Sequence, residues 1–269
     1  MQPRLAIRRV LPVVVLPLLL ATGGCDIVSA GFGSEETAQW QKTYTLPANG
    51  RLEISNVNGR ITVEPSAGNT VDVTAIKKAK AGSPEAAKTE LQRITIAEDV
   101  SASGIKIETK VARNTGGLFS GSGTSVEYHV KVPAAAEVKF STVNGGITMD
   151  GLTGHIDAET TNGGVRGRHI GGPIAASSTN GGVEVELTRV ADGGVKLECT
   201  NGGIRLHLPG DSKATISARI TNGGIQADGL SIDKTDSSRR HLEGRLNGGG
   251  PQIVLEGTNG GIELLARQK

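Results

Sequence analysis

Apolar and polar positions alternate on both sides of a tetrapeptide that recurs through the second half of the chain. It reads TNGG at 161–164, 179–182, 200–203, 221–224 and 258–261, with the variant VNGG at 143–146. Residues six, four and two places before each asparagine, and three and five places after it, are apolar or small. Alternation with a period of two predicts a short strand on each side of the tetrapeptide, with every second side chain facing inward.

The spacing of these repeats predicts how the strands are arranged. Successive repeat asparagines are 18, 18, 21, 21 and 37 residues apart. A steady period near 20 residues is typical of a solenoid, in which each coil buries its inner face against its neighbours. The sequence therefore predicts an all-β fold, a parallel β-solenoid with about 18–21 residues per coil. The longest interval, from Asn222 to Asn259, is interpreted as a coil that carries an insertion at 231–246.

The asparagines and glycines of the repeat are predicted to have structural roles at the corner between two strands. Asparagine tolerates left-handed backbone, and glycine adopts positive φ without a Cβ clash. Equivalent asparagines in stacked coils can also bond to one another through their amides, as in the ladders of stacked strands. The predicted turn and ladder residues are Asn58, Asn144, Asn162, Asn180, Asn201, Asn222 and Asn259.

The outward positions agree with stacking in register. In the three outward columns, at positions −3, +4 and +6 from the asparagine, like charges never fall in repeats that are consecutive along the chain. Stacked strands would bring such residues to about 5 Å, where like charges repel each other.

A seventh repeat lies upstream, where RLEISNVNGRITV at 51–63 matches the same columns, and residues 66–137 interrupt the solenoid after it. The interruption is predicted to form strands at 71–76, 104–111 and 126–132, a helix at 83–94 and a flexible loop at 112–125. Ser83 is the expected helix cap, with Pro84 at the first helical position. We expect this region to be a β-rich cap, since an uncovered solenoid end exposes an unpaired strand edge.

The N-terminus has the features of an export signal. Three arginines precede the apolar run at 10–21, which is too short to span a membrane and is followed by TGGC. Cys25 resembles the lipidated cysteine of a bacterial lipobox, although Thr22 stands where leucine is usual. The alternative is an ordinary cleaved signal that leaves Cys25 as a thiol. The expected organisation is a signal peptide at 1–24, a tether at 25–37, a first rung with its cap at 38–137, and the solenoid repeats at 138–269.

Composition supports a stack of small residues and argues against several functions. The chain has 39 glycines among 269 residues and only 2 % aromatic residues. Removing residues 1–24 removes three arginines and no acid, so the net charge falls from +2 to −1. Basic patches with interleaved aromatics are missing from the sequence, so no nucleic acid is expected as a partner. Acylation of Cys25 would leave Cys199 alone, without a disulfide framework.

The segments GRLEISNVNGRITV, the repeated TNGGI or TNGGV, and the closing GGPQIVLEGTNGGIEL resemble a bacterial adhesin-like family, the type called domain of unknown function 4097. The resemblance covers about residues 43–265. It implies an exported β-solenoid, sometimes encoded near regulators of envelope stress, and supplies no catalytic or binding residues to transfer.

Candidate chemistry is sparse. Asp150 and Glu186 share an outward column two coils apart, near the upper limit of carboxylate separation in an inverting glycosidase. Arg168 lies between them and would keep both ionised, whereas one must be a protonated acid. The five histidines fall at different offsets, so no metal site is expected and no cofactor is predicted. Cys199 falls in an inward column, which favours a buried inert thiol.

These observations predict a non-enzymatic protein of the bacterial cell envelope, lipid-anchored on the periplasmic face or the cell surface. Its expected role is a rigid surface that binds an envelope protein or a glycan, through the outward charged columns or the insertions at 112–125 and 231–246. Two alternatives stay open, an accessory protein of envelope-stress signalling and a carbohydrate-active β-helix enzyme.

Overall fold

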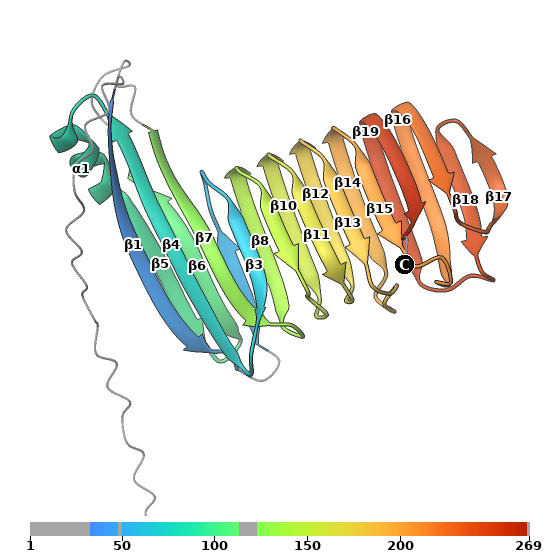
Figure 1. Cartoon of the computed structure of the whole chain (residues 1–269), viewed down its shortest axis with the longest axis horizontal. Helices are drawn as coiled ribbons and strands as arrows, with labels where there is room; N and C mark the ends of the chain where they lie inside the picture. The colour runs from blue at the N-terminus through green and yellow to red at the C-terminus, as the bar shows by residue number, and fades with distance from the viewer. Residues whose placement is uncertain (1–32, 48–49, 113–122, 268–269) are drawn as a thin grey trace, which may run out of the picture. The chain divides into compact units, whose positions relative to one another are not determined.

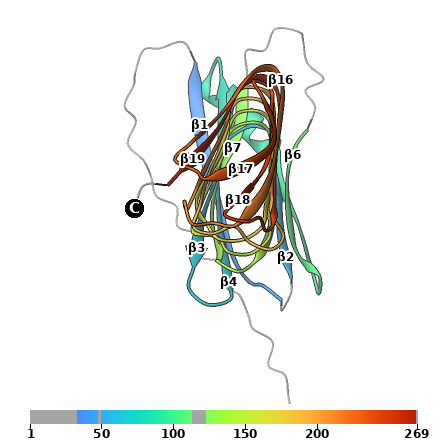
Figure 2. The same ribbon diagram turned by 90° about the vertical axis from the view of Figure 1, so that its right-hand side faces the viewer.

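The computed structural model describes residues 33–47, 50–112 and 123–267. The expected signal peptide, Cys25 and most of the expected tether lie outside these residues. The described chain forms nineteen strands of one sheet and one helix. The sheet folds into two walls that face each other (Figures 1 and 2).

Each coil contributes one strand to each wall, and the asparagine–glycine corner joins them. We call the wall formed before the corner the first wall and the wall after it the second wall. The first wall contains β2 (Arg51–Ser55), β8 (Glu137–Asn144), β10 (Ile156–Asn162), β12 (Ile174–Asn180) and β14 (Val195–Asn201). The second wall contains β3 (Ile61–Ser66), β9 (Ile147–Asp150), β11 (Val165–Ile170), β13 (Val183–Leu187) and β15 (Ile204–Leu208). Two long strands, β16 (Ala214–Asp228) and β19 (Gln252–Ala266), pass through both walls.

The predicted parallel solenoid is confirmed. Ile156 pairs in register with Ile174, and Ile174 pairs with Val195. All three side chains are buried in one core that runs between the walls. Apolar residues at equivalent positions therefore become neighbours along the stack, which is how a chain with few aromatic residues fills its interior.

The order of the last coils differs from the sequence order. Strand β19 pairs with β14 and β15 on one side and with β16 on the other, so the final coil lies between two earlier ones. The chain forms β16, continues outward into a hairpin, and then returns to fill the space beside β15. The expectation that consecutive repeats are always neighbours is wrong at this point.

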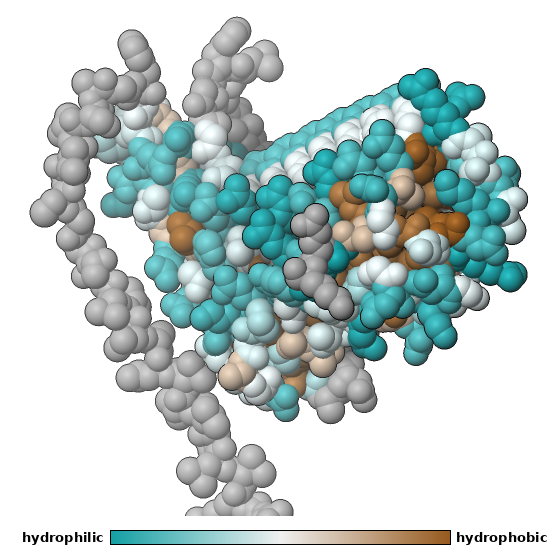
Figure 3. Space-filling view, turned by 45° about the vertical axis from the view of Figure 1, so that its right-hand side comes forward, coloured by the Kyte–Doolittle hydropathy of each residue, from teal (hydrophilic) through white to brown (hydrophobic). Residues whose placement is uncertain are grey.

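The insertion at 231–246 is a strand hairpin rather than a loop. Strands β17 (Ile232–Ser238) and β18 (His241–Leu246) pair antiparallel, and β18 pairs antiparallel with the outer edge of β16. Leu242 and Leu246 are buried, which attaches the hairpin to the core. Apolar surface is visible at this end of the stack (Figure 3), where Ile225 and Ile232 are only partly buried.

The interrupting region extends both walls beyond the first coil. Strands β6 (Gly104–Val111) and β7 (Gly123–Pro133) run parallel beside β2 and β3. Antiparallel strands follow on each wall: β4 (Thr70–Ala81) and β1 (Ser34–Thr45) beyond β7, and β5 (Ile94–Ser101) beyond β6. Helix α1 (Pro84–Gln92) begins as expected, because the Ser83 side chain accepts a hydrogen bond from the Ala86 amide.

Two cap strands were not expected from the sequence. Strand β1 begins at Ser34, inside the range expected for a tether, and its acidic start lies along basic β4, with Glu35 opposite Lys80. Strand β5 follows the helix directly. Side chains of Lys42 and Tyr44 on β1 both contact Glu98 on β5, so they join the two outermost strands of the cap.

Candidate functional site

The repeat asparagines form a continuous row of side-chain hydrogen bonds along the stack. In each bond the Nδ2 of one asparagine donates to the Oδ1 of its neighbour, over 2.7–3.0 Å. At one end, Asn58 instead donates to the carbonyl of Thr124 at 3.1 Å. The row runs through Asn58, Asn144, Asn162, Asn180, Asn201, Asn259 and Asn222, in that order.

The first glycine of the repeat is fixed by both φ and space. Gly163 and Gly181 have φ of 155° and 145°, and a Cβ on either would lie about 2 Å from the carbonyl oxygen of the equivalent glycine in the adjacent coil. The asparagines do not need left-handed backbone: among the described residues, the non-glycine residues with positive φ are His169 and Asn247. That part of the corner prediction is therefore wrong.

A second row of hydrogen bonds, which sequence reasoning missed, runs inside the corner. The residue two places before the asparagine donates to the first glycine carbonyl of the neighbouring coil, from Thr160 at 2.8 Å, Ser178 at 2.7 Å and Cys199 at 3.0 Å. Burial raises the pKa of the Cys199 thiol, which keeps it protonated as the donor that this bond needs. The small hydroxyl residues of this column were a readable signal, because a buried hydroxyl must find an acceptor.

A groove of about 590 Å³ lies beside the corner on the outer face of the second wall. The second glycines of all repeats except the one at 221–224 form its floor, and the outward residues of β9, β11, β13, β15 and β19 form its side. Its lining includes Gly146, Gly164, Gly182, Gly203, Gly261, Thr148, Arg166, Glu184, Arg205, Glu263 and Arg60. The groove therefore crosses several coils and presents backbone and charge together.

Charged side chains in the groove pair along the stack. Arg166 Nε lies 3.2 Å from Glu184 Oε2, and Arg205 Nε lies 2.7 Å from Glu263 Oε2. The hydrogen bond from Arg205 lowers the pKa of Glu263, so this carboxylate is ionised at neutral pH. The pair of Arg205 with Glu263 exists only because β19 lies beside β15.

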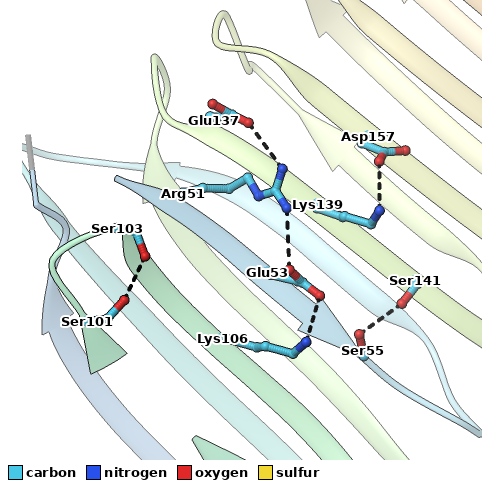
Figure 4. A network of polar contacts seen from close by, with 10 residues as sticks. All are labelled: Arg51, Glu53, Ser55, Ser101, Ser103, Lys106, Glu137, Lys139, Ser141 and Asp157. Atoms are coloured by element: carbon cyan, nitrogen blue, oxygen red, sulfur yellow. Dashed lines mark hydrogen bonds and ion pairs between the residues drawn. The ribbon is translucent and has the colours of Figure 1, made fainter. Parts of the chain in front are cut away.

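The first wall carries its own network of ion pairs near the first coils (Figure 4). Arg51 contacts Glu137 at 3.3 Å, Lys106 contacts Glu53 at 3.3 Å, and Lys139 contacts Asp157 at 3.2 Å. These pairs are solvent-exposed and alternate in sign across adjacent strands, which favours correct stacking more than it adds stability.

The coil order also alters one outward column. Glu198 pairs in register with Glu256, so like charges do meet in adjacent coils there. Lys196 lies 2.8 Å from Glu198 and offsets part of the repulsion.

The two carboxylates considered for catalysis lie in separate contacts. Asp150 Oδ1 lies 2.8 Å from His169 Nδ1, and Glu186 Oε1 lies 3.1 Å from Arg267 Nε. Arg168 is in register with Asp150 on β9, but β11 leaves register with β13 between Gly167 and Ile170. Among the described residues, no ion pair joins Arg168 to either carboxylate. In the part of the chain that the structure describes, no cluster of three metal-ligating residues occurs. A search of that part for helices able to cross a membrane also finds none.

The fold and the corner define a class of proteins with stacked β-coils in register, joined by asparagine–glycine corners. A family model described as Toastrack DUF4097 matches residues 45–265, and the chain belongs to this family.

Two solved structures of bacterial proteins are similar to this chain. A "putative cell adhesion protein" from Clostridium sporogenes is 13 % identical, with 86 % of this chain and 100 % of that chain covered and a TM-score of 0.52. A "putative adhesin" from Bacteroides fragilis is 12 % identical, with 86 % and 97 % covered and a TM-score of 0.42. The comparison with curated proteins finds no match.

Proposed function

We propose that this protein is an exported, lipid-anchored and non-enzymatic binding protein of the bacterial envelope. The observation that carries the proposal is the groove beside the corner, because a glycine and an outward polar or charged side chain recur coil after coil in fixed register. Rows of similar residues running straight along the stack are visible in Figure 3. A surface held this rigidly loses little conformational entropy when it binds, which favours recognition of an extended partner.

The ionisable groups favour binding over catalysis. The carboxylates nearest to a glycosidase arrangement, Asp150 and Glu186, each pair with a different basic residue. The expected partner is an envelope protein or a glycan.

The binding role is tested with isolated envelopes of the source bacterium. Replacing Cys25 by serine in the full chain removes the acylation site. The purified variant, added to washed envelopes, should still sediment with them. Loss of all sedimentation would overturn the binding role. If purified protein instead released reducing ends or unsaturated sugars from a polysaccharide panel, and Glu186→Gln abolished the release, the non-enzymatic assignment would be wrong.

The anchor is tested separately in cells, with a readout that binding to the envelope does not affect. After solubilisation in a detergent that separates into two phases, Cys25→Ser should move the protein from the detergent phase to the aqueous phase, because acyl chains partition into apolar surroundings. The protein is followed by immunoblot, with Cys199→Ser as the matched control. A Cys25→Ser protein that stays in the detergent phase would refute the anchor.

A further inference from the structure

The two glycines of each repeat are under different constraints. A Cβ on the first glycine would overlap the neighbouring coil, as described for Gly163 and Gly181. A Cβ on the second glycine would lie 3.4 Å from its nearest neighbour at Gly182 and 3.5 Å at Gly203, which is ordinary van der Waals contact. Neither of these second glycines has a φ in the left-handed range. The fold therefore does not require glycine at these two positions, whereas a Cβ on Gly164 would lie 3.0 Å from the carbonyl oxygen of Gly182.

The first coil demonstrates this directly, because its second-glycine position is Arg60. The corner there keeps the same backbone bonds: the Ile61 amide donates to the Gly146 carbonyl at 3.0 Å, as the Ile147 amide does to the Gly164 carbonyl. A side chain is thus compatible with the corner. The glycines of the following coils leave open the floor of the groove.

The end of the groove near the first coil carries Arg60 and Arg166. Arg60 lies close enough to Glu127 of β7 for its charge to help lower the pKa of that carboxylate. Arg60 forms no ion pair or side-chain hydrogen bond within the described part of the chain. Arg166 uses Nε for Glu184, which leaves its terminal NH groups available. The two arginines lie two coils apart, about 10 Å along the stack by strand spacing, and their positions differ by two residues along the strand, because Thr62 and not Arg60 is in register with Thr148 and Arg166. An anionic group on alternate units of an extended chain would match this spacing.

Two features of the groove indicate which kind of extended polymer it binds. The described residues that line the groove include no aromatic side chain, so recognition must come from charge and hydrogen bonds rather than from stacking. The backbone at the floor is already bonded to the adjacent coils, as the bonds from Val165 and Val183 to neighbouring glycines show, so no strand edge is available for a peptide. The hydroxyl groups of a polysaccharide can form hydrogen bonds with the polar side chains of such a surface.

We propose that the groove binds an extended acidic polysaccharide, with carboxylates at Arg60 and Arg166 and sugar units along the glycine floor. This inference rests on the proposed function and names the partner of the same surface. Each arginine forms a charge-assisted and geometrically specific contact with a carboxylate.

Calorimetry with the full chain tests the proposal. The probes are oligosaccharides of hyaluronate, whose carboxylates fall on alternate sugars, and of polygalacturonate, with neutral dextran and polyglutamate as comparisons. At least one acidic glycan should bind, more weakly as salt rises. Arg60→Gln and Arg166→Gln should each weaken binding about tenfold. Arg219→Gln, which alters an exposed ion-paired arginine on the first wall, should leave affinity unchanged.

Filling the floor gives an independent readout. Gly182→Val should abolish binding while thermal unfolding stays close to that of the unaltered chain, and Gly82→Val, at an open position outside the groove, should have no effect on binding. If Gly182→Val does not fold, Arg60→Gln and Arg166→Gln still test the proposal. Binding of neither acidic glycan, equal binding of dextran or polyglutamate, or unchanged affinity in both arginine variants would overturn the inference. If envelopes still retain the protein in that case, the proposed function survives.

Discussion

At the scale of single residues, two parallel rows of hydrogen bonds hold the corners of adjacent coils together. The exposed row joins the asparagine amides, and the buried row joins hydroxyl or thiol groups to glycine carbonyls. Both rows follow the stack, so each side chain is positioned by the coil before it and positions the coil after it. This cooperation makes the corner the most constrained part of each coil.

The asparagine row predicts a difference between an internal and a terminal position. Asn180 takes part in two side-chain bonds of the row, to Asn162 and from Asn201, whereas Asn222 takes part in one. We expect Asn180→Ala to lower the free energy of unfolding by about 1–2 kcal/mol and Asn222→Ala by about half as much. Urea unfolding followed by circular dichroism measures both. Equal losses would show that the row contributes no stability of its own.

The asparagine column could be predicted from the sequence because asparagine recurs at the same position of each repeat. A side-chain amide can both donate and accept a hydrogen bond, so stacked asparagines can bond to one another. The buried hydroxyl row was harder to see, since Thr160, Ser178 and Cys199 look like small core residues when only polarity and size are considered. The role of Arg60 was also hidden. Its position gains meaning only when the glycines stacked beside it are known to line a groove.

At the scale of elements, alternation predicted the buried strands well and the polar ones poorly. Strands β4, β6 and β7 contain apolar residues at most second positions, with Lys77 and Thr109 as exceptions, so their inner faces are evident. Strand β1 has no fully buried residue, and most of β17 is exposed. Such edge strands are held by backbone pairing and by charge, and a hydrophobic pattern cannot reveal them.

The cap depends on Glu98, which joins β5 to β1. The ion pair with Lys42 lowers the pKa of Glu98, and the Tyr44 hydroxyl donates to its other oxygen at 2.7 Å. Burial and the bond to Glu98 raise the pKa of Tyr44, which keeps the hydroxyl protonated. Because the carboxyl pKa is lower in the folded state, this stabilisation is present above the ordinary glutamate pKa and is lost as the pH falls through the lowered value.

We therefore expect Glu98→Gln to lower the stability of the cap by about 1 kcal/mol at pH 7 and by much less at pH 3. Trp40 is the single tryptophan of the chain and lies on β1, where Lys42 Nζ is 5.9 Å from its ring centroid. Its fluorescence in urea reports on this end of the sheet. The control is Glu243→Gln on β18, which should not shift the Trp40 transition. A loss that is the same at both pH values would contradict the ionic origin.

At the scale of the whole described stack, the sequence specifies the columns but not the order of the coils. Both β16 and β19 carry apolar residues in the same inward columns, so either fits beside β15. The hairpin of β17 and β18 decides the order, because its antiparallel pairing with the outer edge of β16 leaves the inner edge of β16 open. Residues far apart in sequence, such as Arg205 and Glu263, become partners as a result.

A cross-link tests this order. Glu263 of β19 pairs in register with Arg205, whereas in a stack that followed sequence order Gln226 of β16 would take that place. Paired strands lie about 5 Å apart and strands two places apart about 10 Å, so a disulfide can join only the first kind of pair. We expect Arg205→Cys with Glu263→Cys to form a disulfide under mild oxidation and Arg205→Cys with Gln226→Cys to form none. Peptide mass spectrometry measures both, and a disulfide in the second double variant but not in the first would contradict the coil order and the pairing of Arg205 with Glu263 in the groove.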